Sequence, residues 1–209
     1  MQRLRVGGVE LEYQAEGTGE PVVLIHGGVL ADGLSPLASE PALAEQHRII
    51  SYHRLGYAGS SRARGGVEIA DQAAHCLALL RQLEVEQAHV VGHSSGAMIA
   101  LQLAHDAPDS VATLALLELP DFQLPSSTDF GQGVLGPSFQ RYGGGDKAGA
   151  VDSFMRGGVC GLSFWEAAKR ALPAGALDQA TTDADTSEWK RRPPCLAQCA
   201  HRPGGVVSR

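Results

Sequence analysis

The 209-residue sequence has no apolar run that approaches the ~20 residues of a membrane-spanning helix, so we expect no membrane partner. Its first residues, MQRLRVGG, lack the apolar segment of a signal peptide. The cysteines show no spacing typical of a disulfide framework: Cys76, Cys160, Cys195 and Cys199. Together these absences predict a cytoplasmic protein with reduced thiols.

The sequence also lacks an excess of basic residues. Its formal net charge is -6 at pH 7, which argues against a nucleic-acid-binding surface. Hydrophobic residues make up 44% of the chain and charged residues 19%, which are ordinary values for a globular protein and exclude wholesale disorder. The length suits one domain with a sizeable core.

The most informative stretch of the chain runs from residue 89 to residue 104. The apolar pair Val90 and Val91 precedes the segment Gly-His-Ser-Ser-Gly at 92–96, and an Ala- and Leu-rich run with helical spacing follows. This pattern predicts a strand, a sharp turn and a helix, with Ser94 at the apex. Gly92 and Gly96 would permit the tight turn, because a Cβ at either position would crowd the strand or the helix.

A serine at such a turn is suited to nucleophilic chemistry. The hydroxyl is a poor nucleophile unless it is exposed and beside a base. The amide of Ser95 would lie near the helix N-terminus, where unpaired N–H groups and the helix dipole favour a developing oxyanion. The sequence therefore predicts Ser94 as a nucleophile, and the alternative is an ordinary turn serine.

Strands and helices alternate over the first 119 residues. We predict a hairpin from strands 4–6 and 9–13 joined at Gly7-Gly8, buried strands at 21–25 and 111–119, a strand at 48–52, and helices at 39–46 and 67–83. Ser39 is expected to cap the helix at 39–46. The alternation predicts an α/β fold with a mostly parallel sheet and flanking helices. Sites in such sheets collect at the carboxyl ends of the strands, where four residues fall: His26, His53, Ser94 and Glu118.

After Pro120 the pattern changes to short helical pieces, at 139–142, 146–156 and 163–172, with no strand pattern between them. We predict that residues 1–119 form the core, 120–186 a helical cap over the site, and 187–209 an irregular tail. The alternative for 120–186 is ordinary peripheral packing.

The chain resembles the α/β-hydrolase family, and within it the esterase-like serine hydrolases with a His-Gly-Gly oxyanion loop. Three stretches carry the resemblance: His26-Gly27-Gly28, Arg54-x-Gly56-x-x-Gly59-Ser60, and Gly92-x-Ser94-x-Gly96. It covers Leu4 to about Thr186. The resemblance implies an α/β-hydrolase fold with a second oxyanion amide from Gly28 or Val29. The family usually has Asp where this chain has His53.

The resemblance implies a catalytic acid at the end of the strand after the nucleophile helix, or of the strand beyond. Glu118 fits the first position and Asp121 fits it less well. The alternative for Glu118 is a solvated carboxylate at a strand end. A serine at the nucleophile position disfavours the dehalogenase and epoxide hydrolase members, which use Asp.

The catalytic histidine is the weak point of the resemblance. The order in this fold is nucleophile, acid, then His, and after Glu118 the sequence offers only His201. No strand pattern precedes His201, and the family's last two strands and closing helix have no counterpart. The Arg, Pro, Gly, Ala and Cys bias of the tail indicates a frame slip or misplaced stop near Thr186, which would leave the fold C-terminally truncated. A natural short variant is the alternative.

The favoured hypothesis is a serine hydrolase that cleaves a small carboxylic ester or lactone through an acyl-enzyme. Its predicted residues are Ser94, Glu118 and His201 as catalytic groups and Gly28, Val29 and Ser95 as oxyanion donors. The alternatives are an impaired or non-catalytic binder of small ligands, and a truncated product that folds marginally. We expect no cofactor and no metal, because we interpret the zinc-like spacing of Cys195, Cys199 and His201 as accidental.

Overall fold

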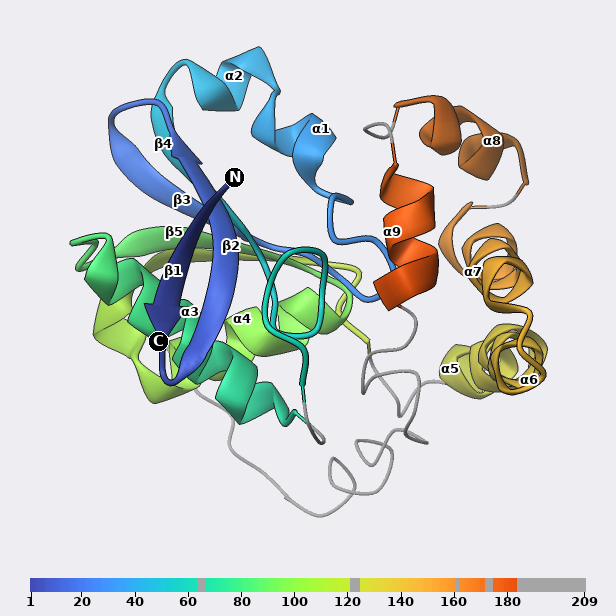
Figure 1. The fold of residues 1–209 in the computed structure, drawn as a ribbon. Helices are drawn as coiled ribbons and strands as arrows, with labels where there is room; N and C mark the ends of the chain where they lie inside the picture. The colour runs from blue at the N-terminus through green and yellow to red at the C-terminus, as the bar shows by residue number, and fades with distance from the viewer. Residues whose placement is uncertain (64–66, 121–124, 161, 172–174, 184–209) are drawn as a thin grey trace.

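A six-stranded sheet forms the centre of the structure (Figure 1). The structure is a computed structural model that describes residues 1–63, 67–120, 125–160, 162–171 and 175–183. The strands are β1 (Gln2–Val6), β2 (Val9–Glu16), β3 (Glu20–Ile25), β4 (His47–His53), β5 (Ala88–His93) and β6 (Val111–Leu117). Their order is β1-β2-β4-β3-β5-β6, and β4, β3, β5 and β6 run parallel. The predicted α/β fold with a mostly parallel sheet is confirmed.

The sequence explains where the individual strands lie. Gly7 and Gly8 have φ values of 55° and 88°, the positive values that a two-residue hairpin turn between β1 and β2 requires. The apolar run that ends at Ile25 places β3 between β4 and β5, where Val23 and Ile25 are fully buried. Apolar side chains on both faces of a strand suit a central, parallel position.

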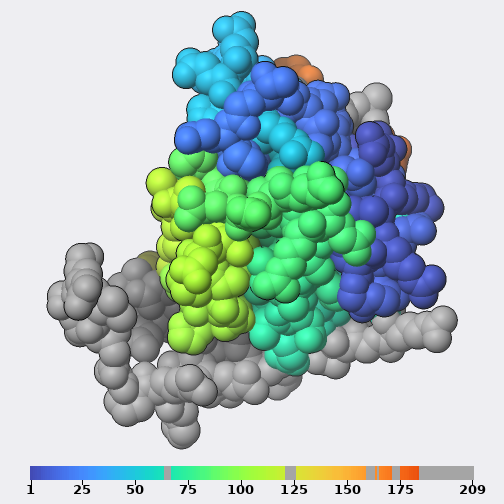
Figure 2. Space-filling model, turned by 90° about the vertical axis from the view of Figure 1, so that its left-hand side faces the viewer, coloured from blue at the N-terminus to red at the C-terminus, as the bar shows by residue number. Residues whose placement is uncertain are grey.

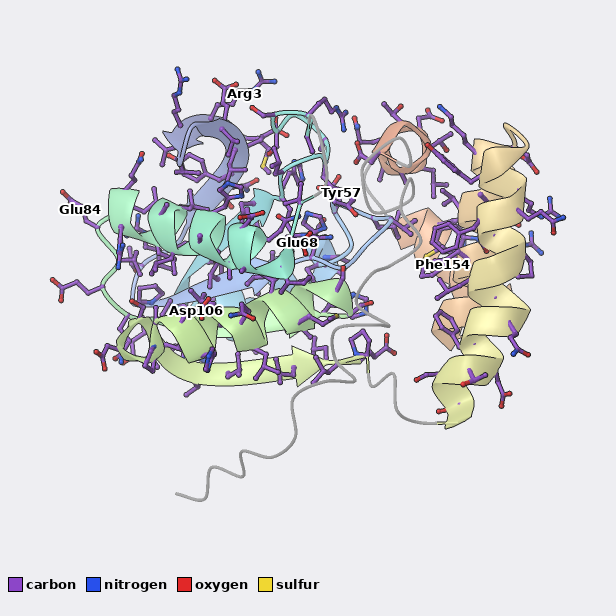
Figure 3. The ribbon with its side chains drawn as sticks, turned by 90° about the horizontal axis from the view of Figure 1, so that it is seen from below. Arg3, Tyr57, Glu68, Glu84, Asp106 and Phe154 are labelled. Atoms are coloured by element: carbon purple, nitrogen blue, oxygen red, sulfur yellow. The ribbon has the colours of Figure 1, made fainter. Side chains whose placement is uncertain are left out.

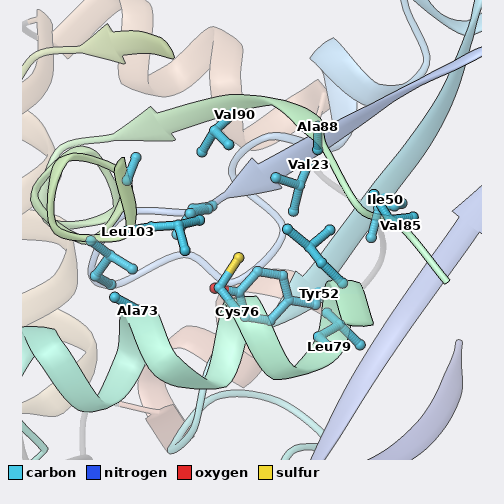
Figure 4. Close-up of a cluster of buried hydrophobic side chains, with 14 of the residues drawn as sticks. Val23, Ile50, Tyr52, Ala73, Cys76, Leu79, Val85, Ala88, Val90 and Leu103 are labelled. Carbon is cyan, nitrogen blue, oxygen red and sulfur yellow. The ribbon is translucent and has the colours of Figure 1, made fainter. Parts of the chain in front are cut away.

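Helices α3 (Ile69–Gln82) and α4 (Ser95–Asp106) pack side by side against one face of the sheet (Figure 2). Their inner faces and the strands form the main core, which includes Val23, Ile50, Leu79, Val90 and Leu103 (Figure 4). Cys76 of α3 lies in this core as a free, fully buried thiol, and burial raises its pKa to about 12.

The opposite face of the sheet is covered by two one-turn helices, α1 (Ser35–Ala38) and α2 (Pro41–Ala44). The single helix expected at 39–46 is therefore wrong in extent, and Ser39 ends α1 instead of capping α2. Each turn has a proline in its first residues, Pro36 and Pro41, where the missing N–H costs nothing.

Strand β6 differs from its expected burial. The run at 111–119 predicts a strand buried on both faces, yet Leu117 is 40% exposed and Leu119 38% exposed. Within the described residues β6 is the last strand of the sheet and pairs only with β5, so its side chains are less covered than those of β3.

A group of short helices lies beyond the carboxyl ends of the strands (Figures 1 and 3). It comprises α5 (Pro125–Phe130), η2 (Gly131–Leu135), α6 (Gly136–Gly143), α7 (Lys147–Met155), η3 (Arg156–Cys160), α8 (Leu162–Ala171) and α9 (Ala176–Asp183). The three expected helical pieces coincide with α6, α7 and α8, whereas α5 and α9 were not expected. Buried side chains of these helices, including Val151, Met155 and Trp165, pack together with Val29.

The division into a core, a cap and a tail stays a prediction, and the tail at 187–209 lies outside the described residues.

A short 3-10 turn, η1 (Pro108–Ser110), joins α4 to β6. In the described ranges, no helix combines the length and apolar character that crossing a bilayer would need.

Candidate active site

Ser94 lies between the end of β5 and the first residue of α4, and it is half-buried. Its φ of 53° and ψ of -120° are uncommon for a residue with a side chain, and they are the kind of turn that the sequence predicts. Strand and helix meet here without room for another Cβ. A Cβ on Gly92 would lie 2.7 Å from the Cα of Ala97, and one on Gly96 would lie 2.5 Å from the carbonyl oxygen of His26.

The loop that follows β3 passes directly beside Ser94. A Cβ on Gly27 would lie 3.2 Å from the Cβ of Ser94 and 2.9 Å from Nδ1 of His93. Further along, Val29 has a φ of 72° and is almost fully buried. The structure thus brings the segment that holds Gly28 and Val29 next to the turn that holds Ser94 and Ser95. Their roles as oxyanion donors stay predictions.

Arg54 joins the three stretches that carry the family resemblance. Its side chain is fully buried, and its Nη2 donates to the carbonyl oxygen of Gly27 at 2.9 Å and to Oγ of Ser95 at 3.4 Å. Its backbone N–H donates to Nε2 of His26 at 3.0 Å, and its guanidinium lies 4.7 Å from the ring centroid of Tyr57. Sequence reasoning used Arg54 only as part of a motif and missed this bridging position.

His26 is neutral and its two ring nitrogens have partners. Nδ1 donates to the carbonyl oxygen of Gly27 at 2.7 Å, and Nε2 accepts the backbone N–H of Arg54. Complete burial lowers the pKa of His26 well below its usual value, and the Arg54 guanidinium lowers it further. His26 therefore holds the loop beside Ser94 and is not placed to act as a base for it.

Glu118 follows β6 on the same edge of the sheet as Ser94. The backbone N–H of Ser94 donates to the carbonyl oxygen of Leu117 at 2.8 Å, which ties the end of β6 to the turn. The carboxylate Oε2 of Glu118 lies 3.0 Å from Nε2 of His93. The role of Glu118 as the acid stays a prediction, and both Asp121 and His201 lie outside the described residues.

His53, which stands at the end of β4, contacts two carboxylates that sequence reasoning did not single out. Nδ1 lies 2.7 Å from Oε2 of Glu12 on β2, and Nε2 lies 3.1 Å from Oδ1 of Asp32, at the end of the loop after β3. The partners are 41 and 21 residues away in the chain, so no local pattern indicates these contacts.

Helix α4 begins directly after Ser94 and ends at Asp106. Figure 3 shows Asp106 on the side of the molecule away from α7, the helix that carries Phe154. Tyr57 lies nearer to α7 in this view. A hollow of about 200 Å³ lies elsewhere, between β2, β4 and helices α1 and α2, and none of the predicted site residues lines it. The cavity expected over Ser94 stays a prediction.

Within the part of the chain that the structure describes, no group of three or more His, Cys, Asp or Glu side chains could hold a metal ion. The zinc-like residues Cys195, Cys199 and His201 lie outside that part.

A family model described as alpha/beta hydrolase fold matches residues 20–152, which include the loop after β3, the Arg54 stretch and the Ser94 turn. The chain belongs to the α/β-hydrolase family. It is 33% identical over 144 residues to the dihydrolipoyllysine-residue acetyltransferase component of the acetoin cleaving system of Pseudomonas putida, a match that covers 68% of this chain and 36% of the relative. It is 34% identical over 115 residues to 2-hydroxymuconate semialdehyde hydrolase of Pseudomonas sp. strain CF600, with 53% and 40% covered. The chain thus spans well under half the length of these curated relatives.

Solved structures give the same fold for this α/β-hydrolase. A thermophilic esterase from Thermogutta terrifontis superposes with a TM-score of 0.66 at 21% sequence identity. The matched region covers 88% of this chain and 70% of the esterase chain. The enol-lactonase from Burkholderia xenovorans LB400 gives a TM-score of 0.67 at 20% identity, with the same two shares. At these identities the likeness concerns the fold alone.

Proposed function

We propose that this α/β-hydrolase cleaves a small carboxylic ester or lactone through an acyl-enzyme. The observation that carries the proposal is the position of Ser94, at φ 53° on the turn between β5 and α4 and beside Gly27 of the loop after β3. A half-buried serine at a helix N-terminus, with the backbone of Gly27 against its side chain, suits attack on a carbonyl carbon.

The proposed reaction has two halves. Oγ of Ser94 attacks the carbonyl carbon and its proton passes to His201, which Glu118 orients. The amides of Ser95 and of Gly28 or Val29 donate hydrogen bonds to the oxyanion. The alcohol leaves with the proton from His201, and water then releases the acid from Ser94 by the reverse sequence.

Two considerations support this substrate class. Carbonyl compounds of ester type form the tetrahedral oxyanion that two amide donors stabilise. Two proteins of similar fold are described as an esterase and an enol-lactonase, and a third as an N-acyl homoserine lactone degrading enzyme.

A second candidate is a catalytically impaired α/β-hydrolase that binds a small ligand. The observation that favours it concerns the histidines: none of those in the described ranges hydrogen-bonds Ser94, and His26 and His93 have other partners. Loss of the histidine from a serine triad costs ~10⁶ in kcat, as subtilisin illustrates. Without a base from His201, this chain would hydrolyse esters at a rate close to that of a triad knockout.

The two candidates are separated by the pH dependence of p-nitrophenyl acetate hydrolysis for the full chain and its His201→Ala variant. Turnover that rises through neutral pH and is abolished in His201→Ala supports the hydrolase with His201 as its base. Slow turnover with the same flat profile in both proteins contradicts that base and favours the second candidate.

A further inference from the structure

Besides the hydrogen bond between His26 and Arg54, the loop that holds the candidate oxyanion donors is fastened once before these donors and once after them. Near its start, Nη2 of Arg54 donates to the carbonyl oxygen of Gly27 at 2.9 Å. At its end, Nε2 of His53 lies 3.1 Å from Oδ1 of Asp32. Gly28 and Val29 lie between these two attachments. Movement of either attachment would therefore move the donors relative to Ser94.

The contacts of His53 with two carboxylates favour a protonated imidazole ring. Oε2 of Glu12 faces Nδ1 at 2.7 Å and Oδ1 of Asp32 faces Nε2 at 3.1 Å. Ionised carboxylates only accept hydrogen bonds, so two such contacts require a proton on each ring nitrogen. The His53 side chain is 8% exposed, whereas those of Glu12 and Asp32 are 19% and 31% exposed. The group is thus largely shielded from solvent.

The backbone around His53 is held independently. Ser60 Oγ donates to the carbonyl oxygen of His53 at 2.6 Å and accepts the backbone N–H of Glu12 at 2.9 Å. The backbone N–H of Gly59 donates to Oε2 of Glu12 at 3.0 Å. The ring and Glu12 are therefore fixed to β2, β4 and the loop after β4, and Asp32 is the partner that belongs to the loop after β3.

We propose that His53 is a positioning residue, which holds Asp32 through a protonated ring and so sets the position of Gly28 and Val29 beside Ser94. Its catalytic consequence rests on the proposed function. In this proposal His53 binds the carboxylate of Asp32 in the same chain and does not contact the substrate.

The titratable groups that face His53 favour the protonated ring. Burial lowers the pKa of His53, but the hydrogen bonds and charges of Asp32 and Glu12 together outweigh it, so the pKa is raised. The nearest other imidazole is His26, whose ring centroid lies 6.3 Å away and which is neutral. As the pH passes the pKa of His53, the contact with Asp32 loses its charge and the loop loses one attachment.

The first test follows the imidazole and the loop together by NMR of the full chain. We expect the amide resonances of Gly28, Val29 and Leu30 to shift along the same titration curve as the ring of His53. In Asp32→Asn, the ring should titrate at lower pH and the loop amides should no longer follow it. A titration of His53 that leaves these amides unmoved in the wild-type chain would overturn the proposal.

The second test is the rate at which a fluorophosphonate labels Ser94 at several pH values. We expect His53→Gln to react roughly ten- to hundredfold more slowly than the wild type near pH 6, the size of effect that a displaced catalytic group causes. The ratio of the two rates should fall toward one as the pH passes the NMR midpoint of His53. Equal rates, or a ratio independent of pH, would contradict a positioning role.

The matched control is His89→Gln. His89 also pairs with a carboxylate, that of Glu20 at 3.2 Å, but it lies near the amino ends of β3 and β5, whereas the loop after β3 lies at the carboxyl end. It should leave both readouts unchanged. If Ser94 is unlabelled in every variant, the proposed function fails, whereas the NMR test still decides the role of His53. Should His53→Gln not fold, Asp32→Asn serves in the labelling test with the same expected ratio.

Discussion

Nε2 of His93 lies 3.0 Å from Oε2 of Glu118, so the residue before Ser94 is joined to the residue that follows β6. The two side chains are 32% and 62% exposed. Exposed pairs of this kind contribute only about 0–1 kcal/mol to stability. The relationship therefore matters because it places the exposed Glu118 carboxylate beside the turn that holds Ser94.

Glu118→Gln separates a catalytic carboxylate from a surface partner of His93. We expect the free energy of unfolding to change by less than ~1 kcal/mol, because the pair is exposed. We expect ester hydrolysis to fall by ~10³-fold or more, as when a serine triad loses its acid. Urea unfolding and steady-state kinetics measure the two quantities. A rate close to that of the wild type, matched by His93→Gln, would assign Glu118 to the His93 pair alone.

The backbone at Ser94 predicts an unusual order of stabilities. Its φ of 53° strains a residue with a Cβ by ~1–3 kcal/mol, and glycine relieves that strain at a cost of ~0.5–1 kcal/mol in chain entropy. Ser94→Gly should thus be about 1 kcal/mol more stable to urea than Ser94→Ala. Ser94→Ala serves as the control because it removes the hydroxyl and keeps the Cβ. An alanine variant of equal or greater stability would argue against strain at the turn.

The close approach of α4 to β3 predicts that Gly96 tolerates no side chain. A Cβ at this position would collide with the backbone oxygens of Ile25 and His26, so Gly96→Ala should lose about 3 kcal/mol or fail to fold. In Gly143→Ala, where nothing lies within 4 Å, stability should instead rise by ~0.5–1 kcal/mol. Guanidinium unfolding compares them, and a well-folded Gly96→Ala would contradict the packing.

The group of Glu12, His53 and Asp32 predicts a defined pH window for stability. The raised pKa of His53 means that its contribution is complete below the usual value of 6.5 and is lost as the pH rises through the raised pKa. Although burial acts to raise the pKa of Glu12, its hydrogen bonds with His53 and Gly59 lower it overall, and the hydrogen bond with His53 lowers that of Asp32. Their contributions are present above the usual values of 4.5 and 3.8 and are lost as the pH falls through the lowered pKa values.

The stability difference between the wild type and His53→Gln should therefore be largest between pH 4.5 and 6.5 and should shrink at alkaline pH. Urea unfolding of both proteins across this range measures the difference, and effects of other groups cancel in the comparison. A difference that is constant or grows with rising pH would contradict a charged His53 in the fold.

Local patterns in the sequence predict most of the architecture. The Gly7-Gly8 hairpin, the apolar run of β3 and Gly92 before Ser94 each act through neighbours in the chain, so spacing alone places them. Gly92 permits the turn at Ser94 because β5 and α4 approach each other without a Cβ between them, whereas Gly96 permits the close approach of α4 to the backbone of Ile25 and His26.

Long-range contacts escape such reasoning. Glu12 and Asp32 look like ordinary strand and loop carboxylates until the sheet brings them to His53. Asp183 is a second example. It is buried at the end of α9 and accepts the backbone N–H of Ala58 and Nη1 of Arg62, both at 3.0 Å, across more than a hundred residues. The exposure of β6 depends on its place in the sheet, which no run of apolar residues reveals.

The central claim is that Ser94 is a nucleophile, and the most direct measurement is fluorophosphonate labelling of the full chain followed by peptide mass spectrometry. We predict a single phosphonylated residue, Ser94, with no labelling in Ser94→Ala and slower labelling in Gly28→Pro, which removes one candidate oxyanion amide. Absence of any adduct on Ser94 in a folded chain, or an adduct that persists in Ser94→Ala, would contradict the account.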